Sequence, residues 1–258
     1  MLILLPPSEG KSGGPAAGPA LDLTTLSFPQ LTTTRNKVLT SLIRLAKGPR
    51  RKAIEALGLS PGLASEIDKD VVLLTAPTLP VAELYTGVLY EALDLAGLPA
   101  AARRKANQQL IVFSALFGAL RPTDRVPPYR LSPGAGLPKL GTLASTWKSA
   151  MPLALEPAAG EGLVLDLRSG PYAALWKPSG DLAQRTVSLR VLHESAPGKR
   201  SIVSHFNKAT KGRIVAQLLC NTTTPRSPAD LADALADAGW HVEPDVTGLR
   251  LDVVVAQV

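Results

Sequence analysis

Two segments far apart in the chain place basic, hydroxyl and amide side chains directly after apolar stretches. The first covers residues 113–131 and the second residues 201–221. Loops that follow buried strands commonly carry the binding and catalytic residues of α/β proteins. Together with a third segment that begins at Asp166, they supply the following candidates for a ligand site: Arg121, Tyr129, Arg130, Arg168, Ser169, Tyr172, His205, Asn207, Lys208 and Lys211.

This mixture of cations and directional hydrogen-bonding groups favours a site for an anion. Cations that converge repel one another, which lowers the pKa of lysine and histidine unless a phosphate or carboxylate is bound. If the site is catalytic, Lys208 and His205 are the acid–base candidates, and Arg121 and Arg130 are the clamps for the anion. The alternative is a solvated helix face, because Lys208 and Lys211 lie within one helical turn.

The N-terminus contains a partial phosphate-binding motif. An apolar stretch, residues 2–5, is followed by PPSEGKS, which ends like the second half of a P-loop. The first glycine of that loop is missing, and Pro6 and Pro7 have no N–H to offer a phosphate. We therefore expect no NTPase here. Ser8 and Lys11 remain candidates for holding a small anion, and an ordinary polar loop is the alternative.

A third pattern indicates DNA binding. Residues 52–67 resemble a helix-hairpin-helix, with Gly58 and Gly62 in the turn, and the preceding residues 35–52 contain seven basic side chains and no acidic one. Backbone N–H groups in such a turn bind DNA phosphates without reading the sequence. A simple packing turn between two helices is the alternative. The predicted DNA contacts are Arg50, Arg51, Lys52, Gly58 and Gly62.

Composition limits the classes of protein that fit. The chain has 258 residues and a formal net charge of +7, so we expect one compact unit and anionic partners. Cys220 is the single cysteine, which excludes an intrachain disulfide and a CxxC metal site. No apolar run approaches the roughly 20 residues that cross a bilayer. We predict a cytoplasmic protein with no membrane role.

The apolar patterns predict a mixed α and β organisation. Strands and helices do not alternate with the regularity of a doubly wound fold. Strands are expected at residues 2–5, 71–74, 110–113, 163–167, 186–192, 201–204 and 249–256. Helices are expected at residues 35–46, 52–57, 81–95, 100–108, 142–155, 208–219 and 228–238.

Several of these stretches also resemble one bacterial family in order along nearly the whole chain. They are MLILLPPSEGK, the Tyr85-Thr86-Gly87 turn, SALFGALRPTDRVPPYRL, Trp147, LVLDLRSGPY and VSHFNKATKGRIVAQLL. The chain resembles the YaaA peroxide-stress protein family in its actinobacterial form. One departure is PPSEGK, where the better-known branch has SPAKT; another is His205-Phe206-Asn207-Lys208, where that branch has a Tyr-Ala-Lys-Lys-like stretch.

The resemblance implies an α+β fold with a mixed central sheet flanked by helices, as a single domain over residues 1–258. It also implies a basic helix-hairpin-helix-like module at residues 35–70, a positively charged cleft, DNA binding and a role in limiting iron-linked oxidative damage. The residues themselves give no support for peroxidase chemistry, a cofactor or a metal site. Two hypotheses stay open: a monomeric protein that protects DNA by binding it, and an enzyme acting on a nucleotide or other small anion.

Overall fold

A mixed sheet with parallel central strands forms the centre of the molecule. The structure is a computed structural model that describes residues 1–196 and 198–256, with the side chains of Ser204 and His205 left out of the description. Within that part, the main sheet runs in the order β4-β3-β1-β6-β7-β10-β9, and β8 pairs with β7. The bounds of its strands are β1 Leu2–Leu5, β3 Leu110–Ser114, β4 Gly118–Leu120, β6 Val164–Asp166, β7 Thr186–Ala196, β8 Lys199–Ser201, β9 His241–Pro244 and β10 Arg250–Val255.

The strand directions determine which residues share an edge of this sheet. Strands β3, β1, β6, β7 and β10 are parallel, while β4, β8 and β9 are antiparallel to their neighbours. All residues of β1 and β3 are buried, as expected for strands covered on both faces. A separate ribbon pairs β2 (Leu79–Pro80) with β5 (Arg125–Val126). The predicted α+β class with a mixed, helix-flanked sheet is confirmed.

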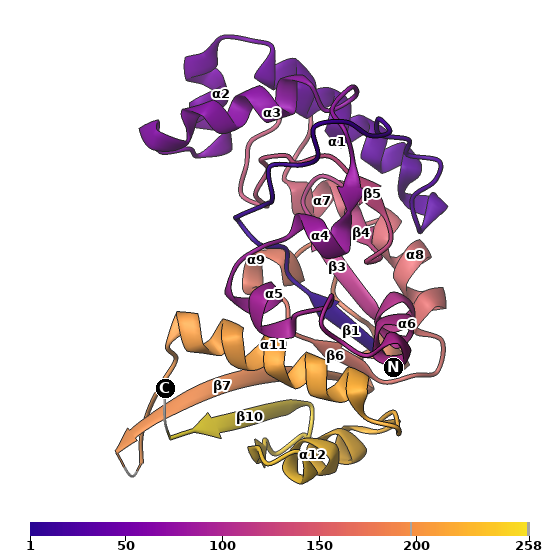
Figure 1. Cartoon of the computed structure of the whole chain (residues 1–258), viewed down its shortest axis with the longest axis vertical. Coiled ribbons are helices and arrows are strands. Elements are labelled where there is room, and N and C mark those ends of the chain that lie inside the picture. Colours follow the sequence, from indigo (N-terminus) through magenta and orange to yellow (C-terminus); the bar gives the residue numbers. More distant parts are fainter. Residues whose placement is uncertain (197, 257–258) are drawn as a thin grey trace.

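Seen as in Figure 1, the helices and strands are arranged in three tiers from top to bottom. The upper tier holds α1, α2 and α3, the middle tier holds β1, β3 and β6, and the lower tier holds β7, β10, α11 and α12. The α-helices are α1 Thr32–Ala46, α2 Arg50–Leu57, α3 Ile67–Val71, α4 Val81–Leu84, α5 Val88–Leu93, α6 Ala100–Gln109, α7 Leu143–Trp147, α8 Ala150–Ala159, α9 Gly170–Ala173, α10 Gly180–Gln184, α11 Ser204–Cys220 and α12 Pro228–Asp237; two 3-10 helices are η1 Pro29–Leu31 and η2 Pro61–Glu66.

The upper tier differs from the sequence-based prediction in two places. The structure does not confirm a helix-hairpin-helix, because α2 is followed by the 3-10 helix η2 and then by the five-residue α3. Gly58 ends α2 with a φ of 63°, whereas Gly62 has ordinary backbone angles and lies in η2. The expected strand at residues 71–74 is also wrong, since these residues end α3 and enter a turn.

The basic run that begins in α1 is not one surface. Arg35 is fully buried and donates hydrogen bonds to the carbonyl groups of Ser27, Phe117 and Ala119 at 2.8–2.9 Å. Burial lowers the pKa of its guanidinium to about 10, although the nearby carboxylate of Asp124 opposes this shift. Arg35 therefore joins α1 to the β3–β4 turn and contributes nothing to the surface charge.

A glycine brings α11 close to α5. A Cβ placed on Gly212 would lie 2.3 Å from the carbonyl oxygen of Leu89, far inside any real contact. Glycine is the residue that permits such a close approach of two backbones. Lys208 lies one turn before Gly212 on α11. The close approach therefore places it beside the loop that leads into α5. Within the described residues, no helix combines the length and the apolar character needed to cross a membrane.

Candidate functional site

A pocket lies at the carboxyl edge of the sheet, where the connections that follow β1 and β6 lead to opposite sides. It leaves β1 toward β3 and leaves β6 toward β7, so the ends of β1 and β6 border a crevice. Open α/β sheets bind ligands at such switch points. A pocket of about 320 Å³ lies there, and the groups that line it include Ser8, Glu9, Tyr90, Ser169, Tyr172 and Lys208.

All four tyrosines of the chain gather at this edge, although they come from distant segments. The hydroxyl groups of Tyr85 and Tyr129 lie 2.8 Å apart, and the rings of Tyr85 and Tyr90 lie 5.6 Å apart. Tyr172 is close enough to interact electrostatically with Tyr129. Burial raises the pKa of every one of these phenols well above its ordinary value. They therefore act as neutral hydrogen-bonding groups.

The surroundings of these hydroxyls favour one direction for their hydrogen bonds. Ser114 Oγ accepts from the backbone N–H groups of Leu116 and Phe117 at 3.2 and 3.0 Å, which occupies both of its lone pairs, so its own proton points to Tyr129, 2.7 Å away. Among the described groups the Tyr129 hydroxyl has no acceptor other than Tyr85, so it donates to Tyr85. The proton of the Tyr85 hydroxyl is left at the end of this chain, which we call the hydroxyl chain.

Lys11 lies beside the hydroxyl chain. Its Nζ is 4.5 Å from the ring centroid of Tyr129 and 5.6 Å from that of Tyr85, and it donates to the carbonyl oxygen of Ser8 at 3.3 Å. A backbone bridge to Tyr85 fixes the position of Lys11. Burial and the positive charge of Arg130 lower the pKa of the Lys11 amine to about 8, against the opposing charges of Glu9 and two acidic residues of the upper tier.

Arg130 and Asp70 complete the surroundings of Lys11. The guanidinium of Arg130 forms an ion pair with Glu9 at 2.5 Å, while its backbone N–H donates to Asp70 Oδ1 at 2.8 Å. Asp70 is fully buried, and its other carboxyl oxygen has no partner. Burial raises the pKa of Asp70 to about 7, despite the hydrogen bond from Arg130 and the charge of Lys11. Near neutral pH, this carboxyl group is partly protonated.

Arg168 and Lys211 lie under the site as part of its support. Arg168 forms a bidentate ion pair with Asp166, donates to the carbonyl of Trp176 at 3.0 Å and stacks 4.2 Å from the ring of Phe113. Its side chain is only 1% exposed, so it has no free face for a ligand. Lys211 Nζ is 3.5 Å from the carbonyl oxygen of Leu167, and burial lowers the pKa of this amine.

Arg121 lies away from the other candidates, at the opposite end of β3. It follows β4, which runs antiparallel to β3 and returns the chain to the amino edge of the sheet. There its guanidinium donates to the carbonyl groups of Gln108 and Leu110 at 2.6 and 3.1 Å and lies 5.2 Å from the ring of Phe28. The structure therefore does not bring Arg121 together with Arg130.

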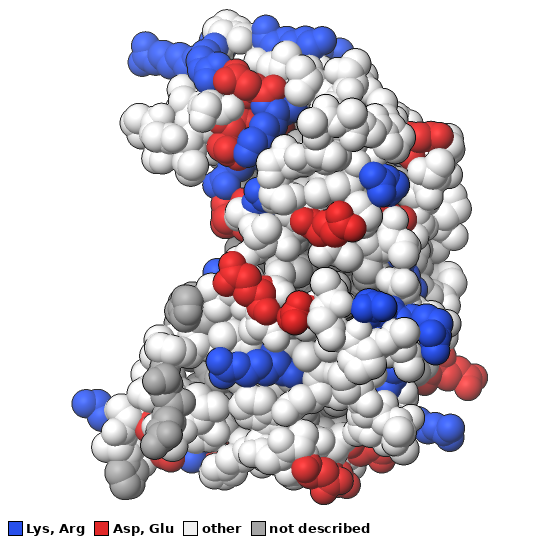
Figure 2. Space-filling model, in the orientation of Figure 1, with Lys and Arg blue, Asp and Glu red and all other residues white. Residues whose placement is uncertain are grey.

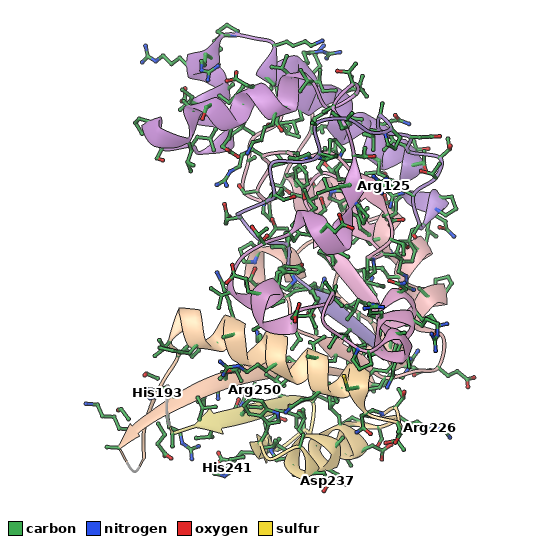
Figure 3. The ribbon with its side chains drawn as sticks, viewed as in Figure 1. Arg125, His193, Arg226, Asp237, His241 and Arg250 are labelled. Carbon is green, nitrogen blue, oxygen red and sulfur yellow. The ribbon has the colours of Figure 1, made fainter. Side chains whose placement is uncertain are left out.

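The remaining candidates lie on α11. Asn207 Oδ1 is buried without a partner among the described groups, and the side chain of His205 is outside the described part. The other two histidines, His193 on β7 and His241 on β9, lie in the lower tier (Figure 3). Among the described side chains, no three His, Cys, Asp or Glu residues gather in an arrangement that holds a metal ion.

Charges of both signs surround the hollow on the left flank of the molecule in Figure 2. The site itself contains Glu9 and Asp70 beside Lys11 and Arg130. A cleft of uniformly positive charge is thus not what the described side chains form. Two of the cations predicted for the site, Arg130 and Arg168, are paired with Glu9 and Asp166.

Five residues of this site were not predicted from the sequence: Glu9, Ser114, Tyr85, Tyr90 and Asp70. For the tyrosines a signal existed, because a chain with four tyrosines places one in the Tyr85-Thr86-Gly87 turn, which interrupts an otherwise helical pattern. Gly87 has a φ of 96° and separates α4 from α5, where one helix was expected. No comparable signal exists for Asp70, whose burial depends on Arg130, 60 residues away.

Known proteins provide an independent comparison. The sequence profile of a family described as "Peroxide stress protein YaaA" matches residues 1–246. The chain belongs to the YaaA family. It is 53% identical to a UPF0246 protein of Streptomyces coelicolor over the full length of both chains. It is also 40% identical to a UPF0246 protein of Corynebacterium efficiens, with 94% of this chain and 95% of the relative covered.

A more distant relative extends the comparison beyond actinobacteria. An uncharacterized protein of Campylobacter jejuni is 29% identical, with 84% of this chain and 83% of the relative covered. The resemblance to the YaaA family that the sequence motifs indicated is therefore confirmed. Because the family match spans residues 1–246, it includes every candidate site residue described above.

Proposed function

We propose that this YaaA-family protein acts in the cytoplasm during peroxide stress, where it binds DNA with little sequence preference and limits peroxide- and iron-linked damage. The observation that carries this proposal is the charge at the end of α1 and the start of α2. Arg44, Lys47, Arg51 and Lys52 are all exposed there, and among the described side chains they form no ion pair. We call these four residues the basic patch.

The electrostatics of α2 favour an anion at this position. Three consecutive cations, Arg50, Arg51 and Lys52, occupy the first turn of the helix, and no acidic side chain is present in that turn. The helix dipole adds partial positive charge at the same end. The side-chain cations and this end of α2 therefore repel one another, and a bound anion relieves the repulsion. A DNA phosphate satisfies both the side chains and the free N–H groups. Arg50 already has a partner, the carboxylate of Asp68 at 2.7 Å.

Charge reversal of the basic patch tests this proposal. The test variant is Lys47→Glu, Arg51→Glu and Lys52→Glu, and the matched control reverses three exposed cations elsewhere, Arg104, Lys148 and Lys177. We expect wild-type protein to bind a duplex of random sequence, with an affinity that falls steeply as salt rises. The test variant should bind at least tenfold more weakly than the control at 50 mM salt.

Equal losses in the two triple variants would contradict a role for the basic patch, because net charge alone would then explain binding. Absence of binding by wild-type protein at low salt would remove the DNA proposal entirely. Circular dichroism of both variants distinguishes loss of contact from loss of fold.

A second candidate function is supported by the pocket between β1 and β6. Lys208 is exposed at its rim, one turn from Gly212, and Ser8 and Ser169 offer hydroxyl groups nearby. Such a pocket fits an enzyme that acts on a nucleotide or another small anion, with Lys208 as the cation that meets it. Binding of nucleoside phosphates, measured by calorimetry, should be lost in Lys208→Ala and kept in the Lys177→Ala control.

A further inference from the structure

Lys11 has an environment that differs from that of an anion-binding lysine. No carboxylate of the described part lies within ion-pair distance of its Nζ, which donates to the carbonyl oxygen of Ser8 at 3.3 Å and lies 4.5 and 5.6 Å from the ring centroids of Tyr129 and Tyr85. Arg130 is already paired with Glu9, and Asp70 lies behind it. A bare anion placed here would meet acidic neighbours and a cation whose charge is already compensated. The site is therefore poorly suited to holding a phosphate by charge.

The same environment suits an amine that reacts. A lysine becomes a nucleophile when it is desolvated and close to another cation, because both effects favour the neutral amine. Lys11 meets both conditions, through the tyrosine faces and through Arg130, and its pKa is lowered to about 8. A sizeable fraction of this amine is then neutral at pH 7.5, whereas an ordinary lysine with a pKa of about 10.4 is almost fully charged.

The hydroxyl chain supplies the second requirement, a proton donor. In the direction argued above, from Ser114 through Tyr129 to Tyr85, the Tyr85 proton has no acceptor among the described groups, and Lys11 Nζ lies 5.6 Å from the centroid of the same ring. A phenol with a raised pKa donates a hydrogen bond to a developing alkoxide without losing its proton to water. The buried carboxyl group of Asp70 is close enough to interact electrostatically with Lys11.

We propose that Lys11 is a nucleophilic amine that forms an imine with an aldehyde, and that the hydroxyl chain ending at Tyr85 stabilises the oxygen of the intermediate. The nitrogen lone pair forms the C–N bond while the C=O electrons move to oxygen, which gives a carbinolamine. Both N–H protons end on that oxygen, which departs as water and leaves the C=N bond. The step is balanced and needs no oxidant or reductant. It goes beyond both functions proposed above.

Aldehyde groups that fit this chemistry come from two sources, an abasic site in DNA and a small free aldehyde. Reductive trapping distinguishes them. The protein is incubated with sodium cyanoborohydride and either a duplex containing one natural abasic site or free glycolaldehyde, and the modified residue is located by tandem mass spectrometry. The glycolaldehyde arm does not require DNA binding, so it remains informative if the DNA proposal fails.

We expect one predominant adduct, on Lys11, in at least one arm. Lys11→Arg should lose it, while Lys177→Arg, which changes an exposed lysine outside the site, should keep it. The trapping rate should rise with pH around a midpoint near 8 and fall about a hundredfold in Tyr85→Phe, the low end of a general acid contribution. The duplex arm alone, the free aldehyde alone, or both would support the proposal and identify the source.

Other results would overturn it. These are no adduct in either arm, adducts spread over surface lysines in proportion to their exposure, or a trapping midpoint above pH 10. If Lys11→Arg fails to fold, the location of the adduct and the pH profile of wild-type protein still decide the matter.

Discussion

The tyrosine-lined site and the basic patch show two different uses of charge in one chain. At the site, Arg130 and Arg168 have fixed acidic partners, and Lys11 is enclosed by aromatic faces. On α2, Arg51 and Lys52 are exposed and form no ion pair among the described residues. Cations held by fixed partners or enclosed by other side chains keep a defined geometry, whereas unpaired surface cations contribute only to the electrostatic potential around the protein. The first region is suited to chemistry and the second to nonspecific attraction.

The sharpest test of this comparison lies within the basic run itself. Arg35 and Lys37 are two residues apart on α1, but Arg35 is buried on carbonyl oxygens and Lys37 is exposed. We expect Arg35→Met to lower the free energy of unfolding by about 3–5 kcal/mol, because several buried carbonyl groups lose their donors. Lys37→Met should change it by less than about 0.5 kcal/mol. Urea denaturation measures both, and equal stability of the two variants would show that Arg35 is not structural.

Two glycines provide the next test, one in each region. Gly212→Ala places a methyl group against the Leu89 carbonyl and should destabilise the protein by about 1–3 kcal/mol, as overpacking does. Gly62→Ala meets no atom within 4 Å and has no unusual φ, so stability and DNA affinity should both stay unchanged. A large loss of DNA affinity in Gly62→Ala would restore the helix-hairpin-helix interpretation of the upper tier.

The third test uses the pH dependence of stability, which should differ between Asp70, in the tyrosine-lined site, and Asp68, beside the basic patch. Its pKa is raised to about 7, so the folded state holds this proton more tightly than the unfolded state does. The stabilisation it gives is complete below the unfolded pKa near 4 and is lost as pH rises toward 7. Asp70→Asn removes that loss, and we expect the variant to gain on the order of 2 kcal/mol relative to wild type between pH 4.5 and 8.

The same pH series on Asp68→Asn should show the opposite sign. Hydrogen bonding to Arg50 lowers the pKa of the exposed Asp68 carboxyl, so its small stabilisation is present above the unfolded pKa and disappears as pH falls. Unfolding curves at pH 4.5 and 8 check the direction for Asp70→Asn, and curves at about pH 2.5 and 6 check it for Asp68→Asn, because the Asp68 contribution is lost only below its unfolded pKa near 4. A gain for Asp70→Asn that is independent of pH would contradict a protonated Asp70.

Sequence alone predicted much of the scaffold because the signals were local. Residues 2–5 and 110–113 read as buried strands from their uninterrupted apolar side chains, and β1 and β3 occupy almost the same bounds. The helix expected at residues 100–108 is α6, Ala100–Gln109. The broken helix at Tyr85 was missed because its cause, the bridge to Lys11, joins segments 74 residues apart.

The candidate site was less predictable, because strand direction decides which residues meet. Arg121 and Tyr129 are eight residues apart in sequence, and both were expected at one edge of the sheet. The antiparallel β4 sends Arg121 to the amino edge, while the chain returns through β5 and brings Tyr129 to Ser114 at the carboxyl edge. A composition-based count of cations also could not show that Arg168 is occupied by Asp166.

The smallest expected effect concerns the boundary between fixed and free charge. In the described structure, Arg50 is the one member of the Arg50-Arg51-Lys52 run that has an acidic partner, Asp68. The side chain of Arg50 is 50% exposed and that of Asp68 is 63% exposed. Asp68→Asn should leave the melting temperature unchanged, since exposed ion pairs contribute little. It should tighten duplex binding about two- to fivefold at low salt and steepen the salt dependence by up to about one phosphate contact, because Arg50 is released toward DNA.

A control of equal charge separates local release from net charge. Asp237→Asn on α12 adds the same charge in the lower tier, far from α2 (Figure 3). If Arg50 contacts phosphate, only Asp68→Asn tightens binding clearly, because the screening length of about 8 Å at physiological salt leaves the α12 charge without effect. Fluorescence anisotropy measures both affinities. Equal tightening in both variants would mean that DNA affinity depends only on net charge, and it would contradict the basic patch as the binding surface.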